Sequence, residues 1–419
     1  MILYLRLSSM KKIIKIYKFR PYIFLKILVG IFLSSFLMGS IPYNDSLEQK
    51  DLYSLNCCLY DCETGRVLFG KNENEPKPMA STTKIMTCII AIESGKLDEN
   101  VCVSKYASSM PDVQLNINEG EQYRLRDLLY SLMLESHNDT AVAIAEHIGG
   151  SVDGFSKLMN DKAKELNLDD TYFITPNGLD STKEIDGVEY KHHTTAKDLC
   201  KIMMYCIKNE TFLEITRTPE YSFYDISGKR NFHVYNKNAF LNMMSGVLSG
   251  KTGFTGEAGY CYVCAYEKDG RTMTLALLGC GWPNNKTYKW HDAKLLIEYG
   301  ISDFEKKRAN IYDNVPERIL VKEAVPGHKS NVYSELYIDK KDIFYYNNKN
   351  GTDIIDVIVD VPEFVNAPTY EGTTIGTIKY YLNNDCIGVE EIKINNNISK
   401  YTYEWCFDKF FNIFLLKIT

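Results

Sequence analysis

The order of the secondary-structure signals constrains the fold of this chain most strongly. Two short strand patterns joined at Glu63-Thr64-Gly65 occupy residues 55–70. A long helical region follows, and a second pair of strand patterns, 259–266 and 272–279, flanks an Asp-Gly turn. Strands that begin and end a helical region favour one antiparallel sheet, closed by its first and last strands, with helices packed against it. We therefore expect an α+β domain.

Helical patterns fill the region between these strands and continue just beyond it. They are predicted at residues 81–95, 125–134, 140–148, 160–166, from 195 onward and at 290–299. Residues 136–139 interrupt the second and third patterns and are expected to form an interhelical loop. Beyond about Lys306 the sequence changes to short alternating strands, such as 354–361 and 374–381, which predict a separate small β domain.

The two ends of the chain have patterns of their own. Residues 1–40 carry seven Lys and Arg, no acid and an apolar stretch at 27–39, which is typical of a secretory signal. An uncleaved N-terminal anchor is the alternative, and either one exports the rest of the chain. Residues 396–419 place aromatic side chains at helical spacing. This predicts an amphipathic helix that lies on a membrane or docks on its own domain.

The charge of the exported part limits its partners. The whole chain carries a net charge of −6, but residues 41–419 hold 41 basic and 54 acidic residues, a net charge of −13. A surface this acidic disfavours nucleic acid as a partner.

The twelve cysteines do not follow the usual pattern of an exported protein. Disulfides are normal in that environment, but most of these cysteines lie inside apolar runs. We interpret them as free buried thiols and expect a reducing or anaerobic habitat. Cys261 and Cys264 have the spacing of half a zinc site, but an offset of three on a strand points two sulfurs to opposite faces. No metal or other cofactor is expected.

Three short strings carry the candidate chemistry: Ser81-Thr82-Thr83-Lys84, Ser136-His137-Asn138 and Lys251-Thr252-Gly253. The first type is common by itself, since Ser-x-x-Lys also starts at Ser8 and Ser9. Together they stand in the order of a nucleophile, a proton relay and an anion clamp within one domain-sized stretch. The set therefore predicts an acyl-transfer site.

Ser81 is the predicted nucleophile and Lys84 its general base. A serine hydroxyl is a poor nucleophile until a nearby base takes its proton. Three residues along a helix correspond to about 4.5 Å along its axis and to nearly the same face, so the Lys84 amine can reach Ser81. Lys84 must be neutral to act, and burial together with a second cation, Lys251, would lower its pKa.

The middle string is expected to move protons and to hold substrate. Ser136 can carry the proton from the base to the leaving amine. Asn138 can donate a hydrogen bond to a backbone carbonyl of a bound peptide.

The third string is expected on the edge of the sheet. Lys251 and Thr252 suit a substrate carboxylate, the lysine by its charge and the threonine by its hydroxyl. Gly253 would leave room for a peptide to add to that edge as a strand. The backbone N–H groups of Ser81 and Phe254 are the expected oxyanion donors.

In their longer form these strings resemble those of the D-alanyl-D-alanine carboxypeptidases, serine peptidases of the low-molecular-mass penicillin-binding proteins. The segments that carry the resemblance are residues 80–87, 136–139, 175–179, 193–196, 250–255 and 258–261. The likeness covers roughly residues 50–395, including the β domain.

The resemblance implies a domain organisation. After the export segment or N-terminal anchor at 1–40, it implies a penicilloyl-serine-transferase (β-lactamase-like) domain at 47–305 with an antiparallel sheet and helices. A small all-β domain at 306–395 and an amphipathic, membrane-associating tail at 396–419 follow.

The resemblance also implies an activity. The substrate would be the D-Ala-D-Ala end of peptidoglycan stem peptides, and Ser81 would be acylated with loss of the last D-Ala before water releases the acyl group. β-Lactams would trap the same acyl-enzyme. The place of action would be the extracytoplasmic face of the cytoplasmic membrane, at the cell wall.

The histidines near the strings need separate interpretation. His137 stands where the family commonly has a small residue such as Gly. Its side chain could line the cleft, but we expect it to point to solvent. His192 and His193 precede the helix start at Thr195 and are expected to be structural.

Two other functions compete with the carboxypeptidase. A class A-like β-lactamase shares the three strings but adds a Glu-x-x-Leu-Asn string for deacylation, and none occurs between Ser136 and Lys251. A β domain and tail also have no place in a single-domain β-lactamase. A non-catalytic wall-binding homologue would lack a catalytic side chain, and none is missing.

Overall fold

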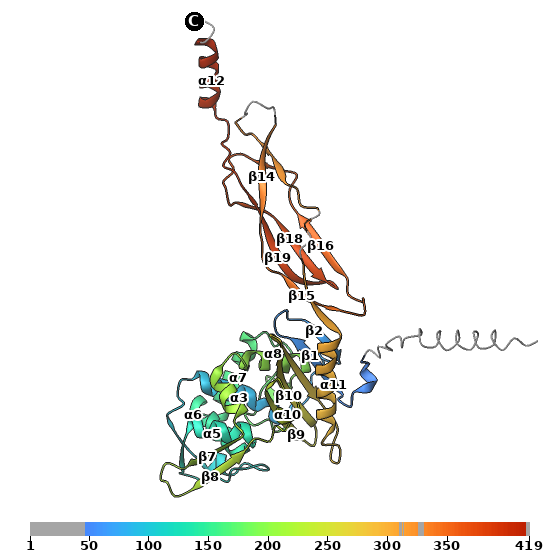
Figure 1. Ribbon diagram of the computed structural model, residues 1–419. Helices are drawn as coiled ribbons and strands as arrows, with labels where there is room; N and C mark the ends of the chain where they lie inside the picture. Colours follow the sequence, from blue (N-terminus) through green and yellow to red (C-terminus); the bar gives the residue numbers. More distant parts are fainter. Residues whose placement is uncertain (1–46, 310–311, 313, 326–330, 416–419) are drawn as a thin grey trace, which may run out of the picture. The chain divides into compact units, whose positions relative to one another are not determined.

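The computed structural model describes residues 47–309, 312, 314–325 and 331–415 (Figure 1). Residues from Leu47 onward form one compact unit. The predicted export segment at 1–40 lies outside the described residues.

A five-stranded antiparallel sheet organises the first part of this unit, in the order β2-β1-β11-β10-β9. Its strands are β1 (Asn56–Asp61), β2 (Val67–Lys71), β9 (Val247–Thr255), β10 (Gly259–Lys268) and β11 (Arg271–Leu278). Asn56 pairs with Leu278 and Asp61 with Met273, so the first and last pairs of strands are joined side by side. The predicted closure of the sheet is therefore confirmed, and β9 is left as an edge strand.

Helices cover both faces of the sheet (Figure 1). They are α3 (Lys84–Glu93), α4 (Lys105–Ser108), α5 (Leu125–Leu134), α6 (Asn138–Gly149), α7 (Val152–Glu165), α8 (Ala196–Cys206), α9 (Glu210–Arg217), α10 (Phe240–Met243) and α11 (Tyr288–Ser302). The predicted helices are all present, and the side chain of Thr195 caps α8 by accepting from the Asp198 N–H.

The two faces of the sheet belong to two separate apolar cores. Cys58, Val263 and Leu278 pack with α3, α5, α6 and α8 on one face. Leu59 and Leu277 pack with α11 on the other face. This alternation is what the period of two along a buried strand predicts.

The cysteines follow the same alternation. Cys261 belongs to the first core and Cys264 to the second, which confirms that the two sulfurs point to opposite faces of β10. All twelve cysteines are free, and eight of them are buried. The habitat inferred from them stays a prediction.

Short two-stranded ribbons connect the helices. They pair β3 (Asn100–Cys102) with β4 (Gln122–Arg124), β5 (Thr182–Ile185) with β6 (Val188–Lys191), and β7 (Glu220–Tyr224) with β8 (Asn231–Tyr235).

The second part of the unit is built from strands, as predicted. Its strands are β12 (Phe304–Arg308), β13 (Arg318–Lys322), β14 (Val332–Asp339), β15 (Phe344–Asn348), β16 (Ile355–Asp360), β17 (Phe364–Asn366), β18 (Thr374–Leu382) and β19 (Asp385–Ile394). Six of them form a sheet in the order β16-β18-β19-β14-β13-β17, while β12 pairs with β15. Ile378, Tyr380 and Ile392 lie in its core.

The predicted tail helix is present as α12 (Tyr403–Leu415). It buries none of its residues, and its aromatic side chains contact one another, with the Phe407 and Phe411 ring centroids 5.0 Å apart. No helix in the described part of the chain combines the length and the apolar character needed to cross a membrane.

Candidate active site

The Ser81 turn begins the central helix of the first core. Residues Ala80–Thr83 form a 3-10 turn that continues directly into α3. The hydroxyl of Thr82 donates to the Met79 carbonyl at 2.6 Å, and that of Thr83 donates to the Ala80 carbonyl at 2.8 Å. These local bonds fix the turn, so Ser81 is presented from a rigid and mostly buried segment.

Lys84 lies at the centre of the site, as predicted. Its Nζ is 2.8 Å from Ser81 Oγ, 2.8 Å from Asn138 Oδ1 and 2.6 Å from the Asn177 carbonyl oxygen. The Asn138 amide nitrogen donates to the Pro111 carbonyl at 3.1 Å, which identifies the atom that faces Lys84 as the oxygen. Two of the three neighbours of Lys84 Nζ, Asn138 Oδ1 and the Asn177 carbonyl oxygen, can therefore only accept hydrogen bonds.

This arrangement suits a neutral amine. A neutral lysine has two N–H bonds and one lone pair, so it can donate to the two carbonyl oxygens and accept from the Ser81 hydroxyl. Burial holds the pKa of Lys84 well below its usual value, and the nearby Lys251 lowers it further, while Asp139 opposes the shift. The lone pair of Lys84 is thus directed at the hydroxyl that must lose a proton.

Ser136 occupies the loop between α5 and α6, also as predicted. Its backbone is left-handed, with φ +72°, which costs energy for a residue with a side chain. Its Oγ is buried and has no hydrogen-bond partner within the described residues. The structure therefore shows no direct bond from Ser136 to Lys84, and it is Asn138 that contacts Lys84.

Backbone and carboxylate contacts hold this loop on its α6 side. The Asn138 N–H donates to the Val113 carbonyl at 2.8 Å. The buried Asp139 carboxylate accepts from the Leu115 N–H at 3.0 Å and the Ile117 N–H at 3.2 Å. Asn138 keeps one amide hydrogen that none of these contacts uses.

The third string lies on the edge strand β9, beside the nucleophile. Lys251 is buried, its Nζ donates to the Thr252 carbonyl at 2.9 Å, and burial lowers its pKa to about 7. A Cβ at Gly253 would lie 2.9 Å from the Ser81 nitrogen and 3.1 Å from the Thr82 nitrogen. Gly253 is thus required by the close approach of the Ser81 turn, a reason different from the room for a peptide that we expected. Phe254 is 42% exposed.

The loop at residues 175–179 contributes a contact that the strings did not predict. The Asn177 carbonyl accepts from Lys84, and the Thr87 hydroxyl donates to the Pro176 carbonyl at 2.6 Å. Gly178 has φ +83°, and a Cβ there would lie 1.9 Å from the Ala80 carbonyl oxygen. The glycine lets this loop pack on the Ser81 turn. A carbonyl has no residue-type signature, so only the family resemblance pointed to this segment.

His192 supports the same turn from behind. Its Nε2 lies 2.8 Å from Thr83 Oγ1, and its Nδ1 accepts from the backbone N–H groups of Ile174 and Thr175. Burial lowers its pKa to about 3, with a smaller contribution from His193, so the ring is neutral. The expected structural role of His192 is confirmed.

The expectation for His137 is wrong. Its side chain is not in solvent, since the residue is only 5% exposed. The ring turns toward α5, where Nδ1 lies 2.8 Å from Ser131 Oγ. The apolar packing of α5 against α6 leaves a buried hydroxyl there that needs a partner, and the sequence pattern of the loop carries no sign of it.

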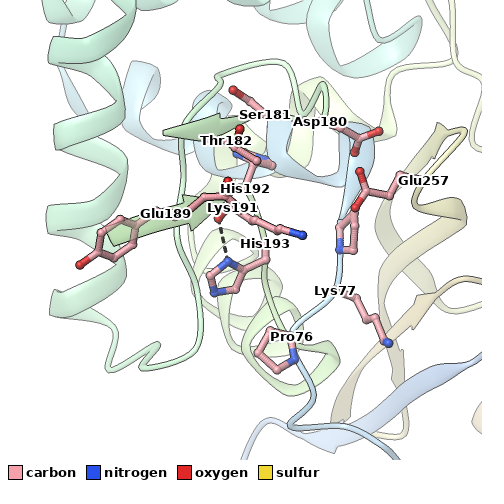
Figure 2. Close-up of a pocket in the computed structure, with 12 residues that line it drawn as sticks. Pro76, Lys77, Asp180, Ser181, Thr182, Glu189, Lys191, His192, His193 and Glu257 are labelled. Atoms are coloured by element: carbon pink, nitrogen blue, oxygen red, sulfur yellow. Dashed lines mark hydrogen bonds between the residues drawn. The ribbon is translucent and has the colours of Figure 1, made fainter. Parts of the chain in front are cut away.

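A pocket of about 690 Å³ lies next to the site (Figure 2). It is lined by the loop at 76–78, by the end of β6 with His192 and His193, and by Asp180 and Glu257. His192 thus separates this pocket from the Ser81 turn, and Glu257 lies just beyond the end of β9.

Comparisons with known proteins agree with this geometry. The family model "D-alanyl-D-alanine carboxypeptidase" matches residues 44–281, and the model "Penicillin-binding protein 5, C-terminal domain" matches residues 329–400. The solved D-alanyl-D-alanine carboxypeptidase DacD from Francisella tularensis matches the fold with a TM-score of 0.64 at 23% identity, covering 86% of this chain and 96% of that one. The chain therefore has a penicillin-binding-protein fold followed by an all-β domain.

Two relatives support the family at the level of sequence. The D-alanyl-D-alanine carboxypeptidase DacF of Bacillus subtilis is 28% identical over 84% of this chain and 88% of its own length. The D-alanyl-D-alanine carboxypeptidase DacB2 of Mycobacterium tuberculosis is 30% identical over 63% of this chain and 86% of its own length. This chain belongs to the D-alanyl-D-alanine carboxypeptidase family of serine peptidases.

Proposed function

We propose that this enzyme removes the terminal D-Ala from peptidoglycan stem peptides through an acyl-enzyme on Ser81. The observation that carries the proposal is the set of contacts around Lys84, which satisfies both N–H bonds of a neutral amine and leaves its lone pair for the Ser81 hydroxyl. The proposal covers residues 47–305 as the catalytic domain and 306–395 as the β domain.

Acylation follows from these contacts. Lys84 Nζ takes the proton of Ser81, and Oγ forms a bond to the carbonyl carbon of the penultimate D-Ala. The carbonyl oxygen becomes an oxyanion beside the backbone N–H groups of Ser81 and Phe254. When the C–N bond breaks, Ser136 passes the proton from Lys84 to the leaving amine. The unpartnered Ser136 hydroxyl is free to make this bridge once substrate is present.

The third string orients the substrate. Protonated Lys251 and the Thr252 hydroxyl receive the terminal carboxylate, and the remaining amide hydrogen of Asn138 bonds a carbonyl of the peptide. The peptide runs along the free edge of β9, toward Glu257 and the pocket at its end. Water then attacks the acyl carbon while Lys84 takes its proton, the bond between that carbon and Ser81 Oγ breaks, and Lys84 returns the proton to Oγ. β-Lactams would acylate the same serine.

We also infer that the enzyme is exported and works at the outer face of the cytoplasmic membrane. The basic, apolar segment at 1–40 supports export. The tail at 396–419 supports attachment, because α12 exposes Phe407, Phe410 and Phe414 while burying no residue. Co-sedimentation of the protein with lipid vesicles tests this inference. The substitution Phe410→Asp should reduce the fraction of protein that binds to the vesicles.

The catalytic proposal is tested by labelling with a fluorescent penicillin. The wild type should be labelled, Ser81→Ala should not, and the wild type should release D-Ala from a pentapeptide ending in D-Ala-D-Ala. Ser94→Ala, directly after the end of α3 and outside the site, is a matched control that should be labelled like the wild type.

Two other outcomes of this experiment would favour one of the alternative functions. An unlabelled wild type would contradict the enzymatic proposal and favour a non-catalytic wall-binding protein. Labelling followed by rapid hydrolysis of penicillin, without release of D-Ala, would indicate a class A-like β-lactamase.

A further inference from the structure

The ring of His137 has a polar protein neighbour at each of its two nitrogens. Nδ1 lies 2.8 Å from Ser131 Oγ, and Nε2 lies 3.4 Å from Glu135 Oε2. Ser131 is itself fully buried, and its Oγ lies 3.0 Å from Thr140 Oγ1. His137 therefore ties the loop between α5 and α6 to the interior of α5, and Ser131 in turn links this contact to Thr140 in α6.

The tautomer of His137 follows from its neighbours. The Glu135 carboxylate can only accept, so the proton belongs on Nε2 and the Nδ1 lone pair accepts from the Ser131 hydroxyl. The Thr140 hydroxyl then donates to Ser131. Burial lowers the pKa of His137 below its usual value, in keeping with this neutral form.

The residue that needs such support is Ser136. A left-handed conformation persists only where the surrounding structure imposes it. On one side, Glu135 accepts from the Tyr235 N–H at 3.0 Å and lies 3.1 Å from the Lys237 amine. On the other side, the ring of His137 supplies the bond to α5. Ser136 is thus strained between two anchored residues.

We propose that His137 is a positioning residue, whose bond to Ser131 holds Ser136 and Asn138 in the orientation that acylation requires. It touches neither Ser81 nor Lys84 by any contact found in the described residues, so it acts through its two neighbours in the loop. The inference rests on the proposed function, since Ser136 and Asn138 must belong to the acylation machinery.

Four ionisable groups near this ring define its electrostatic setting. Glu135 and Asp139 favour a charged imidazole, while Lys84 and Lys237 oppose it. These influences are smaller than burial, which is the main reason that the ring stays neutral.

The test separates the rate of acylation from binding. Acylation by a fluorescent penicillin is measured over a range of concentrations, which gives the dissociation constant of the initial complex and the rate of the chemical step. His137→Leu keeps the volume of the ring but not its hydrogen bonds. We expect it to slow the chemical step by about tenfold or more, with little change in the dissociation constant, because a misplaced group costs rate before it costs binding.

Three further variants identify the bond that matters. His137→Asn places a polar atom where Nδ1 lies and should restore the rate to within about threefold of the wild type. Ser131→Ala should slow the same step, and the Ser131→Ala/His137→Leu double variant should be no slower than the slower single variant, because both remove one interaction. His147→Leu, on α6 and 3.0 Å from Glu99, is the matched control and should have the wild-type rate.

The possible results are distinguishable. If the wild type is not labelled, the proposed function fails. If the wild type is labelled and His137→Leu reacts equally fast, only the inference about His137 fails, and it also fails if Asn and Leu are equally slow. If His137→Leu does not fold, Ser131→Ala takes its place in the test. The inference then fails if Ser131→Ala is acylated as fast as the wild type.

Discussion

Buried basic side chains in two parts of the molecule have opposite surroundings. In the active site, Lys84 and Lys251 are almost fully buried, and neither forms an ion pair with any described carboxylate. Where the catalytic and β domains contact each other, Arg271 Nε lies 3.0 Å from the buried Asp61 carboxylate, and its guanidinium stacks 3.6 Å from the centre of the Tyr346 ring.

A second arginine repeats this pairing at the domain contact. Both guanidinium nitrogens of Arg66 contact the Asp353 carboxylate, at 2.6 and 2.8 Å. The comparison teaches that a carboxylate partner makes a buried cation structural. Without a carboxylate partner, burial lowers the pKa of a lysine instead. A lysine with a lowered pKa can be neutral and act as a base, as proposed for Lys84.

The largest expected effect comes from removing the buried lysine that has no carboxylate partner. Lys84→Met should slow acylation by penicillin by about 10²–10⁴, since the general base is lost. The melting temperature should change by only about 2–4 °C, because removal of a buried amine offsets the three lost hydrogen bonds. Stopped-flow labelling and thermal unfolding check the two parts. Lys162→Met, which removes a lysine paired with Glu93 and Glu165, should keep the wild-type rate of acylation.

Removing a carboxylate partner at the domain contact should lower stability and leave the rate of acylation unchanged. Asp61→Asn leaves the Arg271 charge buried without its carboxylate and should lower the free energy of unfolding by about 3–5 kcal/mol. The rate of acylation should not change. Chemical denaturation and penicillin labelling measure both quantities. A loss of acylation at temperatures where the variant is folded would show that the two parts are not independent.

The lowered pKa of the unpaired Lys251 should also affect how the free energy of unfolding changes with pH. Lysine in the unfolded chain holds its proton up to about pH 10.4, whereas folded Lys251 has a pKa of about 7. Between these values the unfolded state binds more protons, so the free energy of unfolding should rise with pH. The rise should be smaller in Lys251→Met. Denaturation at pH 7 and pH 9.5 tests this, and an equal rise in both proteins would contradict the low pKa.

The smallest effect is expected from a change that keeps the charge. Arg66→Lys retains a cation beside Asp353 but cannot bond both carboxylate oxygens, and it should cost about 1 kcal/mol of stability. Arg124→Lys, at an exposed position that forms no ion pair with any described residue, is the control. If both variants lose the same stability, the two-point geometry of Arg66 has no special value.

Local spacing explains why much of the site was predictable. The separation of Ser81 and Lys84 by one helical turn and the apolar residues after Lys84 are sufficient to predict a neutral base beside a hydroxyl. The patterns around Gly65 and Asp269 likewise predict two hairpins, which the sheet joins. These features depend on residues close together in the chain.

The features that were missed depend on residues far apart in the chain or on backbone atoms. The Asn177 carbonyl reaches Lys84 across 93 residues and has no residue-type signal. The pairing of Asp61 with Arg271 spans 210 residues. His137 was misplaced because its partner Ser131 lies inside an apolar helix, where the sequence gives no hint that a buried hydroxyl needs an acceptor.

The pairing of β1 with β11 also determines when this enzyme can fold. Asn56 meets Leu278 only after more than two hundred intervening residues have been made, and the closure of so long a loop is entropically costly and slow. Until β11 is available, β1 and β2 form a hairpin without a sheet, and such a hairpin is at best marginally stable. The catalytic domain therefore completes its central sheet late, only after nearly all of its residues are available.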